Sequence, residues 1–145
     1  MLVSKGKFLQ YQSVFHNKVI NTPHTIELEI VTAEKPTDTG EFNMDAFVGD
    51  MSRTSKFYKF NALYEKDIPE WNREKWGIPL EVNGVVYLSP KQLVPKLGTF
   101  RLKRNQTKIH FGGSVQIIHK IMYLEEMYDS CVGIQIFVKD DLKGG

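Results

Sequence analysis

The sequence predicts a single domain of mainly β structure, a small antiparallel β-barrel of about eight strands with long loops and one or two short helices. Short apolar runs alternate with polar residues, as they do in half-buried strands. Turn-forming residues such as Asn83-Gly84 and Gly112-Gly113 separate these runs. A length of 145 residues suits one domain, 1–145, and requires no second one.

The N-terminal part is expected to contain strands followed by one long loop. Loose alternation from Phe8 to Phe15 and turn residues at 21–23 predict two N-terminal strands that run antiparallel into the next one. That next strand, Ile26–Ile30, is the clearest, because aliphatic residues and glutamates alternate strictly. Residues 32–50 contain loop formers and scattered acids, which predicts a long exposed loop.

The middle of the chain predicts a strand and then a short helix. Residues 58–64 alternate in a way that favours a strand, although the aromatics at i, i+3 and i+7 from Phe57 would also form a stripe on a helix. Asp67, followed by an early proline, predicts the start of a helix of about two turns. Gly77 is expected to end that helix.

Residues 78–95 are expected to form a hairpin and a loop. The strands Ile78–Val82 and Val85–Ser89 flank Asn83-Gly84, whose two residues both tolerate the positive φ of a tight turn. Residues 89–95 contain two prolines and predict a loop.

A second, basic hairpin is expected over residues 100–111. Its strands would be Phe100–Arg104 and Thr107–Phe111, joined by a turn at Asn105-Gln106. In this register Leu102 lies opposite Ile109, which gives one apolar face.

The same register places like charges opposite one another. Lys103 would face Lys108, and Arg101 would face His110. Two ammonium groups at that separation repel by a little under ~1 kcal/mol in water, so an anionic partner would offset the repulsion.

The C-terminal part predicts two further strands. The glycines at 112–113 allow a sharp bend before a strand at Val115–Tyr123. A last strand, Val132–Val138, places its alternate aliphatic residues on one face.

Charge is sorted along the chain although the formal net charge is only +2. Residues 82–124 contain no acid but seven basic residues: Lys91, Lys96, Arg101, Lys103, Arg104, Lys108 and Lys120. Residues 27–50 contain seven carboxylates against the single Lys35. Such sorting hints at a charged partner. The basic hairpin is interpreted either as a solvated strand face or as a face directed at a nucleic-acid backbone.

Patterns that would indicate catalysis, a metal or a cofactor are lacking in the sequence. The four histidines have no metal-ligand spacing, and no serine elbow or phosphate-binding glycine loop occurs. The lone Cys131 borders an apolar strand and is interpreted as a small core residue. Trp71 and Trp76 are interpreted either as caps on one barrel end or as anchors of a protein interface. We therefore expect no enzyme and no cofactor.

The order of the elements resembles that of the head-closure, or stopper, proteins of tailed bacteriophages. The resemblance spans roughly residues 48–138, and these segments carry it: Tyr87-Leu88-Ser89-Pro90, Leu97-Gly98, Phe100–Phe111, the glycine bend, Ile117-Ile118 and Gly133-Ile134-Gln135-Ile136. It implies a structural virion protein of the phage neck, made in the host cytoplasm. Copies would form a ring that joins the portal or adaptor to the tail, lines the channel for double-stranded DNA and helps to retain the genome.

The charge pattern and the resemblance together give candidate contact residues, and no membrane partner is expected because no apolar run is long enough to span a membrane. The basic candidates for contact with DNA or with a neighbouring ring are Arg101, Lys103, Arg104, Lys108 and His110. The candidates for a loop that contacts a neighbouring subunit are Lys35, Asp38, Glu41, Phe42, Met44 and Phe47. Alternatively, this acidic loop faces the channel and the basic hairpin binds another ring.

Two alternative functions remain open. The first is a monomeric, OB-like barrel that binds single-stranded nucleic acid through Phe57, Tyr58, Phe60 and Tyr64, which lie beside two lysines. The second is another neck or tail component: an adaptor, a tail terminator or a tail-tube relative.

Overall fold

The computed structural model describes residues 4–22, 24–33, 53–66, 68 and 70–141. Within them, seven strands form one antiparallel sheet in the order β2-β1-β5-β6-β7-β4-β3. The strands are β1 (Thr25–Ala33), β2 (Arg53–Asn61), β3 (Leu63–Lys66), β4 (Gly84–Leu88), β5 (Thr107–Phe111), β6 (Ser114–Leu124) and β7 (Gly133–Asp140). The helices are α1 (Lys5–Ile20), α3 (Glu70–Trp76), α4 (Pro90–Leu97) and the short 3-10 helix η1 (Arg104–Gln106).

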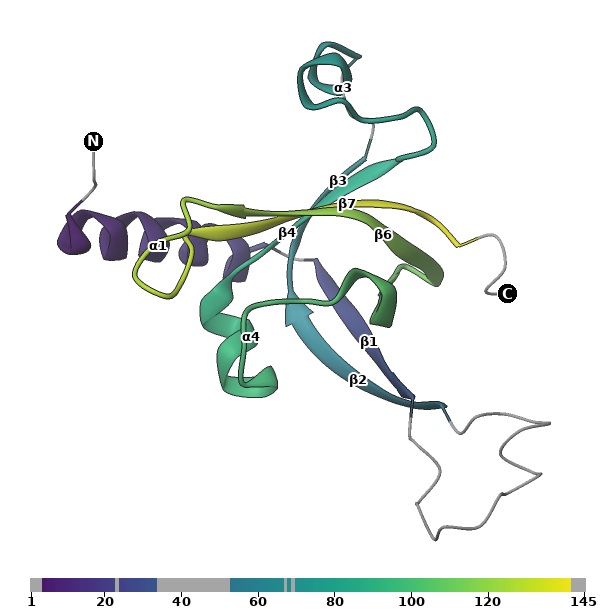
Figure 1. Cartoon of the computed structure of the whole chain (residues 1–145), viewed down its shortest axis with the longest axis horizontal. Coiled ribbons are helices and arrows are strands. Elements are labelled where there is room, and N and C mark those ends of the chain that lie inside the picture. Colours follow the sequence, from purple (N-terminus) through teal and green to yellow (C-terminus); the bar gives the residue numbers. More distant parts are fainter. Residues whose placement is uncertain (1–3, 23, 34–52, 67, 69, 142–145) are drawn as a thin grey trace, which may run out of the picture.

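The sheet curls into a half-barrel, so the predicted mainly β fold is confirmed. β2 and β3 are the two edge strands of the sheet, yet only Ala62 separates them in the chain. The two edges must therefore come together at this residue, which is fully buried and donates its backbone N–H to His24 O at 3.1 Å. In Figure 1, β1 and β2 run steeply across the direction of β6 and β7, as a strongly curled sheet requires.

The curled sheet encloses a main core and carries a second, smaller one on its outside. The main core contains Leu28, Ile109 and Ile136, which come from three different strands. The second cluster places Phe137 under the segment that contains α3. β7 therefore has both faces covered, which explains why residues 134–138 of this strand are all buried.

The prediction of two strands before Thr25 is wrong, because this segment forms α1. Ser4 is the N-cap and its side chain accepts a hydrogen bond from Lys7 N at 3.3 Å. Phe8, Gln12 and Val19 are buried at a spacing of i, i+4 and i+11, which is one face of a helix. Loose alternation between Phe8 and Phe15 concealed this period.

The predicted hairpin around Asn83-Gly84 is also wrong. Residues 78–83 form no strand, and β4 pairs instead with β3 and β7. Gly84 is needed for space, because a Cβ there would lie 2.7 Å from the Tyr64 hydroxyl. The small residue serves a close approach between strands rather than a tight turn.

The predicted loop at 89–95 is the helix α4. Ser89 caps its start by accepting a hydrogen bond from Lys91 N at 3.2 Å, and Pro90 occupies the first turn. Gly98, with φ of 76°, ends the helix and donates its N–H to Val94 O at 2.8 Å. The two prolines of this segment, Pro90 and Pro95, thus both lie within a capped helix of two turns.

The predicted basic hairpin does not form. β5 pairs with β1 on one side and with β6 on the other, so residues 100–104 have no strand edge to join. Leu102 is buried as predicted, but its N–H is taken by the Tyr123 hydroxyl at 3.0 Å rather than by β5. The predicted facing pairs, Lys103 with Lys108 and Arg101 with His110, are therefore wrong.

Of the predicted loop at 32–50, Thr32 and Ala33 belong to β1 and the other residues lie outside the described residues. The other predicted elements are confirmed. They are the strand at 26–30, the strand character of 58–64 with a break at Ala62, the short helix ended by Gly77, and the last two strands. Gly112 and Gly113 have φ of 57° and 83° and form the tight turn between β5 and β6.

Candidate interaction surfaces

Arg101 already has a carboxylate partner within its own chain. It lies in the irregular segment between α4 and η1, and its Nη2 is 2.7 Å from Glu126 Oε1. The guanidinium carbon lies 5.0 Å from the ring centre of Phe100 and 5.3 Å from that of Tyr123. The ring contacts position the guanidinium, and Glu126 partly neutralises its charge. The Arg101 side chain nevertheless remains 58% exposed.

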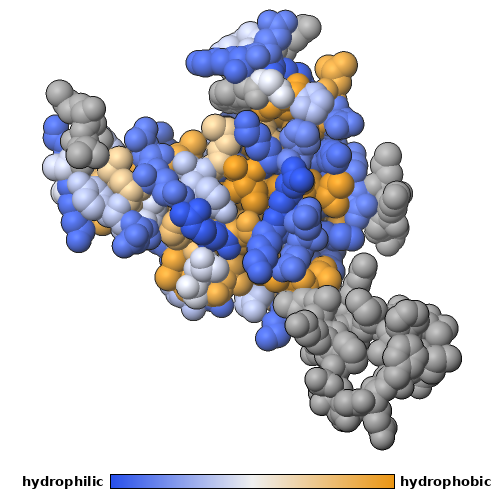
Figure 2. All heavy atoms as spheres, viewed as in Figure 1, coloured by the Kyte–Doolittle hydropathy of each residue, from blue (hydrophilic) through white to orange (hydrophobic). Residues whose placement is uncertain are grey.

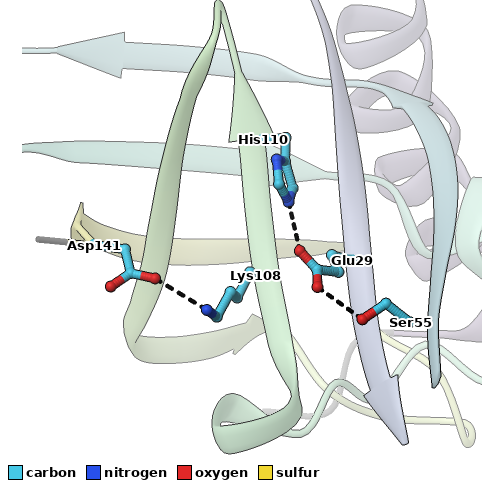
Figure 3. A network of polar contacts seen from close by, with 5 residues as sticks. All are labelled: Glu29, Ser55, Lys108, His110 and Asp141. Atoms are coloured by element: carbon cyan, nitrogen blue, oxygen red, sulfur yellow. Dashed lines mark hydrogen bonds and ion pairs between the residues drawn. The ribbon is translucent and has the colours of Figure 1, made fainter. Parts of the chain in front are cut away.

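Lys108 and His110 lie on β5, and each has an acidic partner from another strand or segment (Figure 3). Lys108 Nζ is 3.0 Å from Asp141 Oδ2, and His110 Nε2 is 2.7 Å from Glu29 Oε1. In Figure 3, Glu29 on β1 and Ser55 on β2 lie on one side of β5, and Asp141 lies on the other side. Most of the positive charge predicted for β5 is thus balanced inside the chain.

Glu29 is the centre of this network. Its Oε2 accepts a hydrogen bond from Ser55 Oγ at 2.8 Å, while its Oε1 contacts His110. Burial by itself would raise the pKa of Glu29, but the hydrogen bonds from His110 and Ser55, with the charges of His110 and Lys108, outweigh burial and hold that pKa below 4.5. The side chain is only 17% exposed, so the carboxylate is held ionised inside the network.

Lys103 and Arg104 are exposed and lie apart from the β5 pairs. Arg104 Nη1 donates to His119 O at 3.0 Å. The Lys103 carbonyl accepts from Gln106 N at 3.0 Å, whereas the Lys103 side chain makes no hydrogen bond or ion pair with the described residues. Lys103 and Arg101 share the lining of a cavity of about 240 Å³ with Tyr58 and Leu97. The five predicted basic residues therefore do not form one surface. Arg101 and Lys103 line this cavity, Arg104 lies in η1, and the other two lie on β5.

The predicted subunit-contacting loop cannot be placed. All six of its candidate residues, Lys35, Asp38, Glu41, Phe42, Met44 and Phe47, lie outside the described residues.

Cys131 and His16 both take part in the packing of α1 against the rest of the chain. Cys131 is fully buried, as predicted, and its carbonyl accepts a hydrogen bond from Gln12 Nε2 at 2.9 Å. Burial, with the negative charge of Glu126, raises the pKa of the Cys131 thiol to about 12. His16 Nδ1 lies 2.6 Å from Ser89 Oγ, and burial together with the charge of Lys91 lowers the pKa of His16. These two hydrogen bonds join α1 to the 125–132 loop and to the N-cap residue of α4.

One apolar projection stands out on the segment of α3 and the residues after it. Leu80 is 87% exposed and Trp71 is 66% exposed. Figure 2 shows hydrophobic spheres projecting from the segment that follows α3. Trp71 was recognised in the sequence as a possible interface anchor, but Leu80 was missed because it was assigned to a strand of the predicted hairpin.

An apolar groove lies beside α1, on another side of the molecule. It has a volume of about 180 Å³ and is lined by Phe8, Tyr11, Glu125, Met127 and Val132. Sequence reasoning missed this groove, because the residues of α1 face the 125–132 loop only when residues 5–20 are helical.

The described residues contain no group of three or more histidine, cysteine, aspartate or glutamate side chains that could hold a metal ion. No helix in the described part of the chain is long and apolar enough to cross a membrane. Comparisons with models of protein families, with curated proteins and with solved structures found no match.

Proposed function

We propose that this chain is a structural joining protein that forms a ring, as the neck proteins of tailed phages do, and connects a head-side portal or adaptor ring to the tail. One observation carries the proposal: two separate elements of a small barrel expose large apolar side chains. α1 presents Leu9, Tyr11 and Val14, which are 46%, 50% and 51% exposed. The α3 segment presents Trp71 and Leu80.

Two different apolar surfaces are what a head-to-tail ring contact requires. In such a contact one surface of each copy meets the other surface of the next copy, and repeated contacts close a ring when the rotation fits. α1 extends beyond one end of the sheet and α3 stands above it, so the surfaces point in different directions (Figure 1). On α1, Tyr11 and Val14 lie three residues apart on one face, whereas Leu9 lies on the opposite face. Exposed apolar side chains that lie together mark protein contacts more often than isolated ones do.

The contact with DNA is proposed to be weak in each copy and to add up around the ring. Arg101, Lys108 and His110 have acidic partners in the chain, which leaves Lys103 and Arg104 as the better candidates for a phosphate backbone. Two such charges make few contacts, and a single copy would therefore hold DNA poorly. A ring multiplies these contacts without requiring a base-specific site.

Sedimentation of the full chain over a wide concentration range tests the proposal, together with binding of a fluorescent single-stranded oligonucleotide at low salt. We expect weak self-association that rises with protein concentration, rings in electron micrographs, and little oligonucleotide binding by the monomer. Tight oligonucleotide binding by a chain that stays monomeric would contradict the proposal. Genomic position offers a second test, since a place between portal and tail genes supports a neck protein.

One observation favours the OB-like alternative. Phe57 on β2 is 54% exposed, and Lys59 lies two residues further on the same side of the strand. An exposed aromatic ring beside a cation is a stacking platform for a base. In that case, replacing Phe57 with alanine should weaken oligonucleotide binding and leave self-association unchanged.

A further inference from the structure

We infer that Leu80 of one copy inserts into the groove beside α1 of the next copy, with Phe8, Tyr11, Met127 and Val132 as the receiving walls. This inference rests on the proposed ring function and names the surfaces that would build the ring.

Leu80 is presented from a firmly held segment. Ile78 and Val82, on either side of it, are buried in the second hydrophobic cluster. Arg73 Nη1 donates to Pro79 O at 2.8 Å, and Ile78 N donates to Arg73 O at the same distance. A leucine held on both sides and yet 87% exposed loses little conformational freedom when it docks.

The groove has the size and character to accept such a side chain. Its volume is about 180 Å³, and a cavity on the order of 150 Å³ with apolar walls is enough to bind a benzene ring. Phe8 is almost fully buried and forms the floor, while Tyr11 is half exposed at the edge.

The wall opposite α1 is also preformed. Met127 and Ser130 exchange two backbone hydrogen bonds of 3.0 Å, and Val132 N donates to Leu124 O at 2.8 Å. The ring of Tyr128 packs edge-on against Phe8 with centres 5.5 Å apart. The groove therefore exists before any partner arrives.

The projection and the groove both carry charged side chains, and Glu81, directly beside Leu80, is paired with Lys139 at 3.8 Å within its own chain. Lys75, in the last turn of α3, and Glu74 are both exposed. Glu125 lines the groove, and Lys7 lies one helical turn before Tyr11 on α1. A docked copy can place Lys75 near Glu125, and Glu74 near Lys7, which favours this orientation over its reverse.

We take the occupant to be a second copy, because each copy carries a rigid apolar projection and a groove of matching size on different sides of the molecule. In Figure 1, α3 stands above the sheet while α1 and the 125–132 loop lie beyond its end. Leu80 cannot reach the groove of its own chain in this arrangement. Each copy thus offers one projection and one groove, and the resulting contact extends from copy to copy.

Site-directed cross-linking of the full chain tests this contact even when association is weak. Leu80→Cys protein is mixed with Tyr11→Cys protein and treated with a short bismaleimide. Cys131 does not interfere, because it is buried and its pKa is raised to about 12. We expect a mixed cross-linked dimer at least tenfold more abundant than with the control, Val94→Cys, an exposed position on α4.

Sedimentation then measures the energetic role of the same residues. Leu80→Asp should weaken self-association by about tenfold to 100-fold, as expected for a buried anchor, and Val94→Asp should not. Lys75→Glu and Glu125→Lys should each weaken it, and the combined variant should recover. Circular dichroism checks that every variant remains folded.

The outcomes separate this contact from the ring itself. Rings that form equally well with Leu80→Asp, or cross-linking no better than the control, would overturn the contact and leave the ring function standing. A wild-type chain that neither associates nor cross-links at any concentration would overturn both. Failure of the combined charge variant to recover would overturn the orientation.

Discussion

His110 Nε2 lies 2.7 Å from Glu29 Oε1 across the pairing of β5 with β1, in which Glu29 stands directly opposite Lys108. This pairing brings Glu27 and Glu29, at the start of the acid-rich part of the chain, beside Lys108 and His110 of the base-rich part. Cross-strand pairs of opposite charge stabilise a sheet. Part of the charge sorting in the sequence therefore has an internal explanation, and an external anion is not required at β5.

The network around Glu29 predicts a loss of stability in acid. Because the folded state holds the pKa of Glu29 below its ordinary value of 4.5, the ionised carboxylate contributes stability that is fully present above pH 4.5. That contribution is lost as the pH falls from 4.5 through the folded pKa. Glu29→Gln should lower the free energy of unfolding by about 1–2 kcal/mol at neutral pH and flatten its decline below pH 4.5. Urea denaturation at a series of pH values measures both effects.

Glu27→Gln is the matched control, because Glu27 lies on the same strand and is exposed. Its stability should stay within about 0.5 kcal/mol of the wild type. An acid profile for Glu29→Gln that parallels the wild-type profile would show that the network does not depend on the ionised carboxylate.

Lys108 and Lys103 should respond differently to loss of charge. Lys108→Gln removes the ion pair with Asp141, whose side chain is only 9% exposed, and should cost about 0.5–1 kcal/mol of unfolding free energy. Lys103→Gln removes an exposed charge with no ion pair among the described residues and should be neutral. Thermal denaturation of the two variants side by side measures the difference. Equal effects would argue against the Lys108–Asp141 pair.

The sequence predicted the strands whose local period is unambiguous and failed where distant residues decide the outcome. Strict alternation in β1 and the glycine turn before β6 were sufficient for correct predictions. Gly84 looked like a turn residue, but the Tyr64 hydroxyl is what requires a glycine there. Nothing local to Gly84 reveals a strand that lies twenty residues earlier in the chain.

The candidate sites were harder to predict than the fold, for a related reason. Arg101 and Lys108 were correctly seen as basic, but their partners Glu126 and Asp141 lie far along the chain and are brought close only by the sheet. The groove beside α1 exists only because residues 5–20 form a helix, whereas the alternation of apolar residues in this segment predicted strands. Surfaces built from two distant segments leave no local pattern.

Cys131 should be almost inert toward thiol reagents in the native protein. It is fully buried, and a thiol whose pKa is raised to about 12 supplies almost no thiolate at pH 8. Labelling with a chromogenic disulfide reagent should be at least about 100-fold slower in buffer than in denaturant. Fast native labelling would show that α1 and the 125–132 loop open readily and leave Cys131 accessible.

Gly133→Ala should weaken the packing of α1 through Phe15 on the start of β7. A Cβ at position 133 would lie 2.4 Å from Cζ of Phe15, a distance that forces the aromatic ring or the helix to move. Overpacking of this kind costs about 1–3 kcal/mol of unfolding free energy. Urea denaturation measures the loss. Relative to the wild type, the variant should show a larger increase in the amide hydrogen-exchange rate in α1 than in β7.

Two further variants make this prediction specific. Gly6→Ala is the same substitution within α1 at a site with nothing within 4 Å, and should stabilise the protein by up to about 1 kcal/mol. Adding Phe15→Leu to Gly133→Ala should recover part of the loss, since the smaller side chain gives the methyl group room. If Gly133→Ala alone kept wild-type stability and helix protection, Phe15 would not pack on Gly133, and the groove beside α1 would lose its support.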